Sequence, residues 1–193
     1  TEGIQYKMHL PNYDVFDEKR YFEPGSESSI FDLDGIRIGV NICDDIWIDN
    51  GPFEVQAKKG ADLIVNITAS PFYVGKTKIR REFIRRRAKE NRVAVVYLNL
   101  VGGQDDLVFD GGSYLFNREG EPIACCKQFE EELLVADLDG DGKAASAEII
   151  ALYVPPPPRN LQATAVAEDK VKLTWNGSDP EDTIAKYNVY RAT

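Results

Sequence analysis

Cys43 stands at the end of an apolar run and is followed by two acids and an aromatic residue, in the order Ile42-Cys43-Asp44-Asp45-Ile46-Trp47. In many proteins a free cysteine is simply a small buried hydrophobe. As a thiolate it is a nucleophile that can attack an amide carbon. That reaction also needs a base to take and return a proton, and a cation or hydrogen-bond donors for the oxyanion. Cys43 by itself is compatible with both interpretations.

The elements around Cys43 predict where the thiol lies. Apolar β-branched residues at alternate positions predict a buried strand over 36–42 that ends directly before Cys43. Gly39 leaves room for close approach of another backbone segment. The Asp34-Gly35 turn predicts a hairpin with residues 30–33. In a layered α/β fold the carboxyl edge of the sheet usually carries the chemistry, so Cys43 is expected at that edge.

Further elements follow in strand–helix–strand order, which predicts an α/β layered fold. Helical spacing of apolar residues predicts a helix over 76–91, and Gly60 is expected to close a short helix over 53–59. Apolar runs predict strands at 4–10, 61–67, 93–100, 111–116, 121–125 and 133–138.

Five sequence motifs in the same order resemble the carbon–nitrogen hydrolase (nitrilase) superfamily and, within it, the glutaminase domains of glutamine-dependent NAD synthetases. They are Lys-x-His-Leu-Pro-Asn-Tyr, Phe-Asp-Glu-x-Arg-Tyr-Phe, Asn-Ile-Cys-Asp-Asp-Ile-Trp, Ala-Ser-Pro-Phe and Asn-Leu-Val-Gly-Gly-Gln-Asp. The resemblance covers residues 1–139 and implies a four-layer αββα sandwich, here incomplete at its N-terminal side. It favours the nucleophilic interpretation of Cys43.

The resemblance also implies a set of site residues. Cys43 would form a γ-glutamyl thioester from glutamine and release ammonia, and Lys7 would favour the thiolate and stabilise the oxyanion. Glu18 matches a supporting glutamate, with a structural ion pair as its alternative. The family's general-base glutamate lies well upstream of the lysine, and only six residues precede Lys7. We therefore expect the base to be absent from this chain and the activity to be impaired.

By the same resemblance, Tyr13, Asp44 and Ser70 would bind L-glutamine. The ammonia would pass to an ATP-dependent NAD synthetase domain, whose pyrophosphatase loop this chain lacks, and the hydrolase domain itself would need no cofactor. A homo-oligomer is also implied. Two alternatives stay open: a nitrilase-family amidase acting on another small amide, and a non-catalytic secreted multidomain binding protein.

Composition narrows the classes of partner. A net charge of −9 and a pI near 4.7 argue against nucleic acid as a partner. The basic run over 80–89 is expected to be a solvated helix face with local ion pairs. Neither a membrane-spanning run nor a signal peptide is apparent. Three cysteines do not make a disulfide framework, which favours a cytoplasmic location.

The composition changes near residue 139. Residues 137–154 include a pattern that fits a calcium loop of the EF-hand or dockerin type followed by a helix, with ligands at Asp137, Asp139, Asp141 and Glu148. Alternatively, this stretch contains the last hydrolase strand. Residues 155–159 predict a polyproline linker, and residues 160–193 resemble a partial fibronectin type III domain with strands at 160–165, 171–175 and 187–191. Such modules, if genuine, would favour an extracellular location.

Overall fold

The computed structural model describes residues 3–138, 144–153, 159–167 and 170–176. The chain divides into two units, Thr1–Val154 and Pro155–Thr193. Among the helices in these ranges, none has the length and apolar character needed to cross a membrane.

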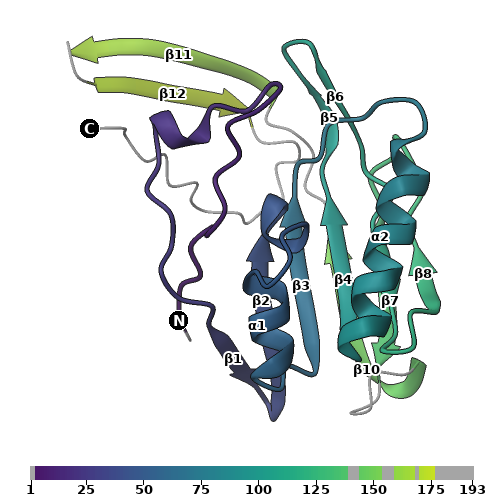
Figure 1. Cartoon of the computed structure of the whole chain (residues 1–193). Coiled ribbons are helices and arrows are strands. Elements are labelled where there is room, and N and C mark those ends of the chain that lie inside the picture. The colour runs from purple at the N-terminus through teal and green to yellow at the C-terminus, as the bar shows by residue number, and fades with distance from the viewer. Residues whose placement is uncertain (1–2, 139–143, 154–158, 168–169, 177–193) are drawn as a thin grey trace. The chain divides into compact units, whose positions relative to one another are not determined.

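The first unit is built on a six-stranded mixed sheet in the order β1-β2-β3-β4-β7-β8 (Figure 1). Strands β2, β3 and β4 are parallel, and the other neighbours pair antiparallel. The carboxyl ends of the three parallel strands therefore meet at one edge. The strand bounds are β1 Ile30–Leu33, β2 Ile36–Ile42, β3 Leu63–Thr68, β4 Ala94–Asn99, β7 Tyr114–Phe116 and β8 Pro122–Cys125.

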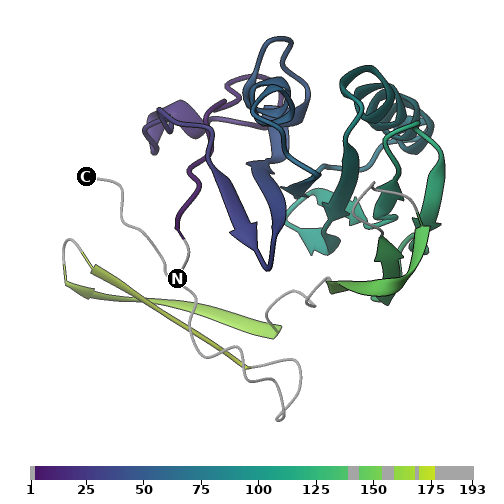
Figure 2. The same ribbon diagram turned by 90° about the horizontal axis from the view of Figure 1, so that it is seen from below.

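Two helices, α1 (Pro52–Lys58) and α2 (Lys76–Asn91), cover one face of this sheet (Figure 2). Both predicted helices are confirmed, and Gly60, with φ of 84°, ends α1 as expected. The core between helices and sheet consists of fully or nearly fully buried side chains, which include Phe53, Ile84, Ala88, Val95, Tyr97 and Phe116. Their spacing along α2 and their alternation along β4 are the patterns that predicted these elements.

Strand β2 carries small and polar residues, not large apolar ones, on its helix-facing side. A Cβ atom added to Gly39 would lie 2.8 Å from the side-chain oxygen of Gln56 on α1. Gly39 thus makes room for a polar side chain, so the predicted close approach of another backbone segment is wrong. Gln56 uses that space to donate to the carbonyl of Val40 at 2.7 Å.

Several local elements differ from the predictions. The predicted strand over 4–10 is wrong, because residues 3–12 pair with no strand. A hairpin of β5 (Val101–Gln104) and β6 (Leu107–Asp110) was not predicted. Two 3-10 turns, η1 (Glu18–Arg20) and η2 (Cys43–Ile46), complete the region.

The other face of the sheet contacts β9 (Leu133–Leu138), which pairs antiparallel with β10 (Ala144–Tyr153). Leu134 and Ala136 of β9 pack against a second apolar cluster of Leu63, Ala94, Val96 and Leu115. The described residues thus form a helical layer, a mixed sheet and a hairpin on its far face, and the predicted α/β sandwich is confirmed.

The calcium-loop prediction needs correction in its second half. An EF-hand loop is followed by a helix, but residues 144–153 form strand β10 paired with β9. Asp137 lies in β9 and Glu148 in β10, while Asp139 and Asp141 lie outside the described residues. The alternative, that Leu133–Leu138 is a strand of the hydrolase domain, agrees with the structure.

The second unit contains one antiparallel hairpin of β11 (Arg159–Ala167) and β12 (Lys170–Asn176). These strands cover the first two of the three predicted in the tail. The third, at 187–191, and linker residues 155–158 lie outside the described residues. A single hairpin is common to many β folds, so the fibronectin resemblance stays a prediction.

Candidate active site

Cys43 follows the last residue of β2 and opens the η2 turn, at the carboxyl edge where it was expected. Its φ of 49° places it in the left-handed region, which is uncommon for a residue with a side chain. Such a conformation costs about 1–3 kcal/mol and persists only where the surroundings enforce it. Cys43 is partly exposed and is not in a disulfide, so its thiol is available to a reactant.

A row of buried amide side chains holds this turn. Gln56 on α1 accepts from Asn41 at 3.1 Å, and Asn41 accepts from Asn66 on β3 at 2.7 Å. Asn66 also donates to the carbonyl oxygen of Cys43 at 3.2 Å. All three amide side chains are fully buried. The row therefore connects α1, β2 and β3 to the backbone of the nucleophile.

Arg87 fixes the other end of the turn. Its guanidinium donates to the carbonyls of Ile46 and Trp47 at 3.1 and 3.2 Å, and forms ion pairs with Asp49 and Glu54. Arg87 and Arg80 are 3% and 0% exposed, so the prediction of a solvated basic face is wrong for these two residues. Arg81, Arg85, Arg86 and Lys89 are exposed, as predicted.

The N-terminal segment brings Lys7 and Glu18 to the same edge. The Lys7 ammonium donates to both carboxylate oxygens of Glu18 at 2.6 Å. Both residues line a cavity of about 610 Å³ together with Cys43, and apolar side chains form most of its remaining wall. The structure thus brings together the three residues predicted to be catalytic. It also realises the alternative suggested for Glu18, an ion pair, but with Lys7 as its partner.

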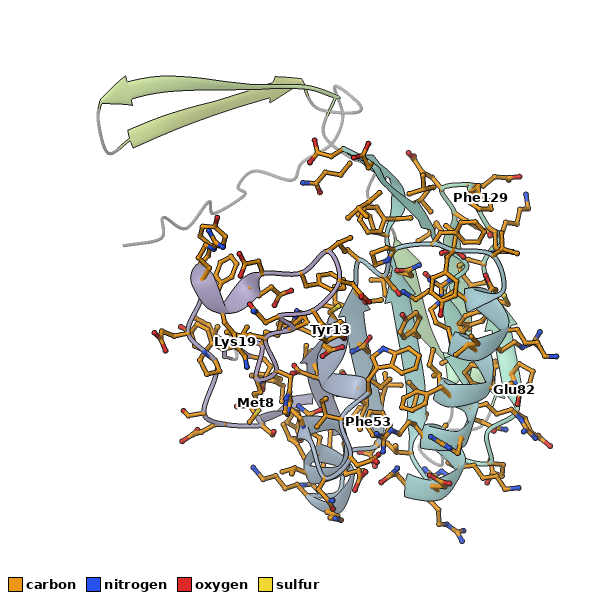
Figure 3. All side chains as sticks on the ribbon, turned by 45° about the horizontal axis from the view of Figure 1, so that its top comes forward. Met8, Tyr13, Lys19, Phe53, Glu82 and Phe129 are labelled. Carbon is orange, nitrogen blue, oxygen red and sulfur yellow. The ribbon has the colours of Figure 1, made fainter. Side chains whose placement is uncertain are left out.

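A second, smaller cavity of about 260 Å³ also contains Cys43 in its wall. Its lining includes all three predicted binding residues, Tyr13, Asp44 and Ser70. The Tyr13 hydroxyl donates to Asp44 at 2.8 Å, and burial and this carboxylate raise the pKa of Tyr13. Figure 3 shows Tyr13 on the N-terminal segment beside the ends of the strands.

Lys76, the first residue of α2, lines this second cavity and was not predicted as a site residue. Burial, and then the nearby Arg80 cation, lower its pKa. The cavity thus has one cation, Lys76, and two carboxylates, Asp14 and Asp44. The sequence places Lys76 just after the Ala-Ser-Pro-Phe motif, but nothing in a lone lysine distinguishes it from a surface residue.

The wall at Ser70 rests on a buried polar network behind the cavity. Asn99, at the end of β4, accepts from the backbone N–H of Ser70 at 2.9 Å and donates to Asp110 at 3.3 Å. Asp110 also forms a fully buried ion pair with Arg80. The position of Ser70 therefore depends on side chains from β4, β6 and α2.

Comparison with known proteins identifies the family. The carbon-nitrogen hydrolase profile matches residues 1–146. The chain belongs to the carbon-nitrogen hydrolase family. This carbon-nitrogen hydrolase is 47% identical over 143 residues to the glutamine-dependent NAD(+) synthetase of Thermotoga maritima, a match that covers 72% of this chain and 24% of the relative.

Two solved structures resemble the hydrolase. The glutamine-dependent NAD+ synthetase of Acinetobacter baumannii is 38% identical with a TM-score of 0.67, over 74% of this chain and 28% of that one. The Nesterenkonia sp. AN1 amidase is 28% identical with a TM-score of 0.55, over 63% of this chain and 44% of that one. In a variant of that amidase, the acetamide moiety of fluoroacetamide is covalently added at the active-site cysteine. The chain spans 24–27% of the length of the curated relatives it matches.

Proposed function

We propose that this domain hydrolyses the side-chain amide of L-glutamine through a thioester on Cys43. One observation carries the proposal: the thiol borders both a cavity with a lysine–glutamate pair and a cavity with one ammonium and two carboxylates. The first places a cation for the oxyanion beside the thiol, and the second matches the charged end of an amino acid. The names of the synthetase relatives, which specify glutamine, support the same substrate.

The proposed reaction has two balanced steps. The Cys43 sulfur attacks the amide carbon, and the thiol proton moves to the leaving nitrogen, which departs as ammonia. Water then adds to the thioester, giving glutamate and restoring the thiol. We assign Lys7 to stabilise the oxyanion in both steps, and Glu18 to hold the Lys7 ammonium in place through its two hydrogen bonds.

Charge complementarity assigns the ends of the substrate. Asp44 would bind the α-ammonium and Lys76 the α-carboxylate, because these charges line the same cavity. Tyr13 already donates its hydroxyl to Asp44 and would hold that carboxylate. A simple amide such as acetamide lacks both charges, so this cavity favours glutamine over the alternative substrates.

We further propose that the ammonia is used for NAD synthesis by an ATP-dependent domain like that of the synthetase relatives. Cys43, Cys125 and Cys126 are free thiols, in keeping with a reducing, cytoplasmic setting.

Covalent labelling tests the proposed nucleophile and substrate together. A glutamine analogue with a diazoketone in place of the amide should add once to the protein, as measured by intact mass. Glutamine should block the addition, acetamide should not, and Cys43→Ala should remain unlabelled. Labelling that glutamine does not block, in a folded protein, would contradict the proposed substrate.

The role of Lys76 is tested by Lys76→Met. The glutamine concentration that protects this variant from labelling should be at least 10-fold higher than for the wild type, because a charge-assisted hydrogen bond to the carboxylate contributes about 1.5–3 kcal/mol. Iodoacetamide, which carries no carboxylate, should still label Cys43 at the wild-type rate. Lys58→Met is the matched control, since Lys58 is an exposed lysine on α1 outside both cavities. Unchanged glutamine protection in Lys76→Met would exclude the assignment.

A further inference from the structure

Asp45, two residues after the nucleophile, is fully buried and has no part in the proposed chemistry. Its carboxylate accepts three backbone N–H groups: Met8 at 3.1 Å, His9 at 2.7 Å and Ile42 at 3.1 Å. Burial raises the pKa of Asp45, while these three hydrogen bonds act in the opposite direction. A buried carboxylate is costly unless such donors satisfy it, so its place in the fold needs an explanation.

The positions of the three donors supply that explanation. Ile42 directly precedes Cys43, and Met8 and His9 directly follow Lys7. One side chain thereby joins the backbone beside the nucleophile to the backbone beside the lysine. His9 and Asp45 are 36 residues apart in the sequence, so this hydrogen bond joins distant parts of the chain.

The N-terminal segment has few other attachments to the sheet. Within the described residues, the only other hydrogen bond between residues 3–25 and residues 36–136 joins Tyr13 to Asp44. Other described hydrogen bonds of residues 3–10, such as the one from Gly25 N–H to the carbonyl of Lys7 at 2.7 Å, stay within residues 3–29. The segment forms no strand, so no ladder fixes its register against β2.

We propose that Asp45 is a positioning residue that sets the Lys7 ammonium against the Cys43 thiol. The inference rests on the proposed function, in which Lys7 acts on Cys43. Asp45 itself contacts neither substrate nor thiol in this scheme. Its effect on Cys43 therefore passes through Lys7, and this dependence separates it from a general contribution to stability.

A double-mutant cycle on Asp45 and Lys7 tests this dependence. The rate of Cys43 alkylation by iodoacetamide at pH 7 is measured for wild type, Asp45→Asn, Lys7→Met and the double variant by mass spectrometry of the peptide that contains Cys43, because Cys125 is also an exposed free thiol. Asp45→Asn should slow alkylation about 10- to 100-fold, because a displacement near 1 Å at a reacting centre costs about that much. In the Lys7→Met background the same substitution should change the rate less than 3-fold.

Asp62→Asn is the matched control, because Asp62 also accepts a backbone N–H, from Arg37 at 2.9 Å, but lies outside both cavities. It should leave the alkylation rate unchanged. Equal effects of Asp45→Asn with and without Lys7 would overturn the inference. If Lys7→Met alone leaves the rate unchanged, the proposed role of Lys7 fails instead.

Hydrogen exchange on the wild type provides a second measurement if Asp45→Asn does not fold. The amides of Met8 and His9 should be protected to a degree similar to those of β2, although they belong to no strand. Free exchange of both amides would overturn the inference, because the proposed attachment would then be absent in solution.

Discussion

Asp110→Asn is expected to lower the free energy of unfolding by about 3–5 kcal/mol at pH 7, because it leaves the Arg80 cation buried without its counter-ion. Both side chains of this pair are fully buried. Asp110 also accepts from Thr77 at 3.1 Å and from Gln128 at 2.8 Å, so the substitution disturbs several donors at once. Denaturant unfolding followed by circular dichroism measures the change.

An exposed ion pair on the same helix provides the control. Glu82 and Arg85 are 63% and 48% exposed and lie 3.9 Å apart, so Glu82→Gln should change stability by less than about 1 kcal/mol. Adding Arg80→Met to Asp110→Asn should recover part of the loss, since the unpaired charge is then removed. A cost below 1 kcal/mol for Asp110→Asn would contradict this account.

The same pair predicts a pH dependence with a definite sign. Burial alone would raise the pKa of Asp110. The hydrogen bond and positive charge of Arg80, together with the hydrogen bonds from Gln128 and Thr77, outweigh burial and lower the pKa below 3.8. The unfolded state then binds the proton more tightly than the folded state. The stability that ionised Asp110 contributes is therefore fully present well above pH 3.8. It is lost as the pH falls through the lower pKa that Asp110 has in the folded state. The stability gap between wild type and Asp110→Asn should shrink over that acidic range.

Lys7→Met should slow labelling of Cys43 by the diazoketone analogue about 100-fold or more, because it removes the cation proposed to stabilise the thiolate and the oxyanion. Methionine keeps much of the apolar stem that lines the 610 Å³ cavity. The measurement is the rate of mass addition at pH 7, with circular dichroism to establish folding.

Two further variants serve as comparisons for Lys7→Met. Glu18→Gln should cause a smaller loss, since it keeps the Lys7 cation and one acceptor oxygen. Lys58→Met, which changes a lysine that is 70% exposed outside the cavity, should have no effect. A folded Lys7→Met protein that is labelled at the wild-type rate would rule out this role for Lys7.

The elements that carry Cys43 could be predicted because their patterns are local. Strand β2 and helix α2 begin and end at the predicted residues, Ile36–Ile42 and Lys76–Asn91. Alternating β-branched residues and helical spacing are properties of short windows and survive in the folded state. The motifs likewise located Lys7 and Glu18, whose ion pair joins positions 11 residues apart.

Interactions over long separations could not be predicted in this way. Lys76 reaches the same cavity as Asp44 only because β3 and α2 bring it there, and a lone lysine carries no signal of that. Arg80 and Arg87 resemble their exposed neighbours on α2 in sequence, yet their partners Asp110 and Glu54 lie on other elements. Residues 4–10 have the composition of a strand, but in the part of the chain that the structure describes no strand pairs with them.

The buried amide row also favours one alignment of β2 with β3. Asn41 and Asn66 are directly opposite in the parallel pairing of β2 and β3. A slip of one residue would turn one amide to the opposite face of the sheet and separate it from the other. Each unpaired buried amide costs about 1–3 kcal/mol, whereas the aliphatic neighbours would tolerate many alignments. Asn66 also donates to the Cys43 carbonyl. A chain that pairs these strands out of register therefore loses the hydrogen bond that holds the turn of the nucleophile, so the same residue supports both strand register and the position of Cys43.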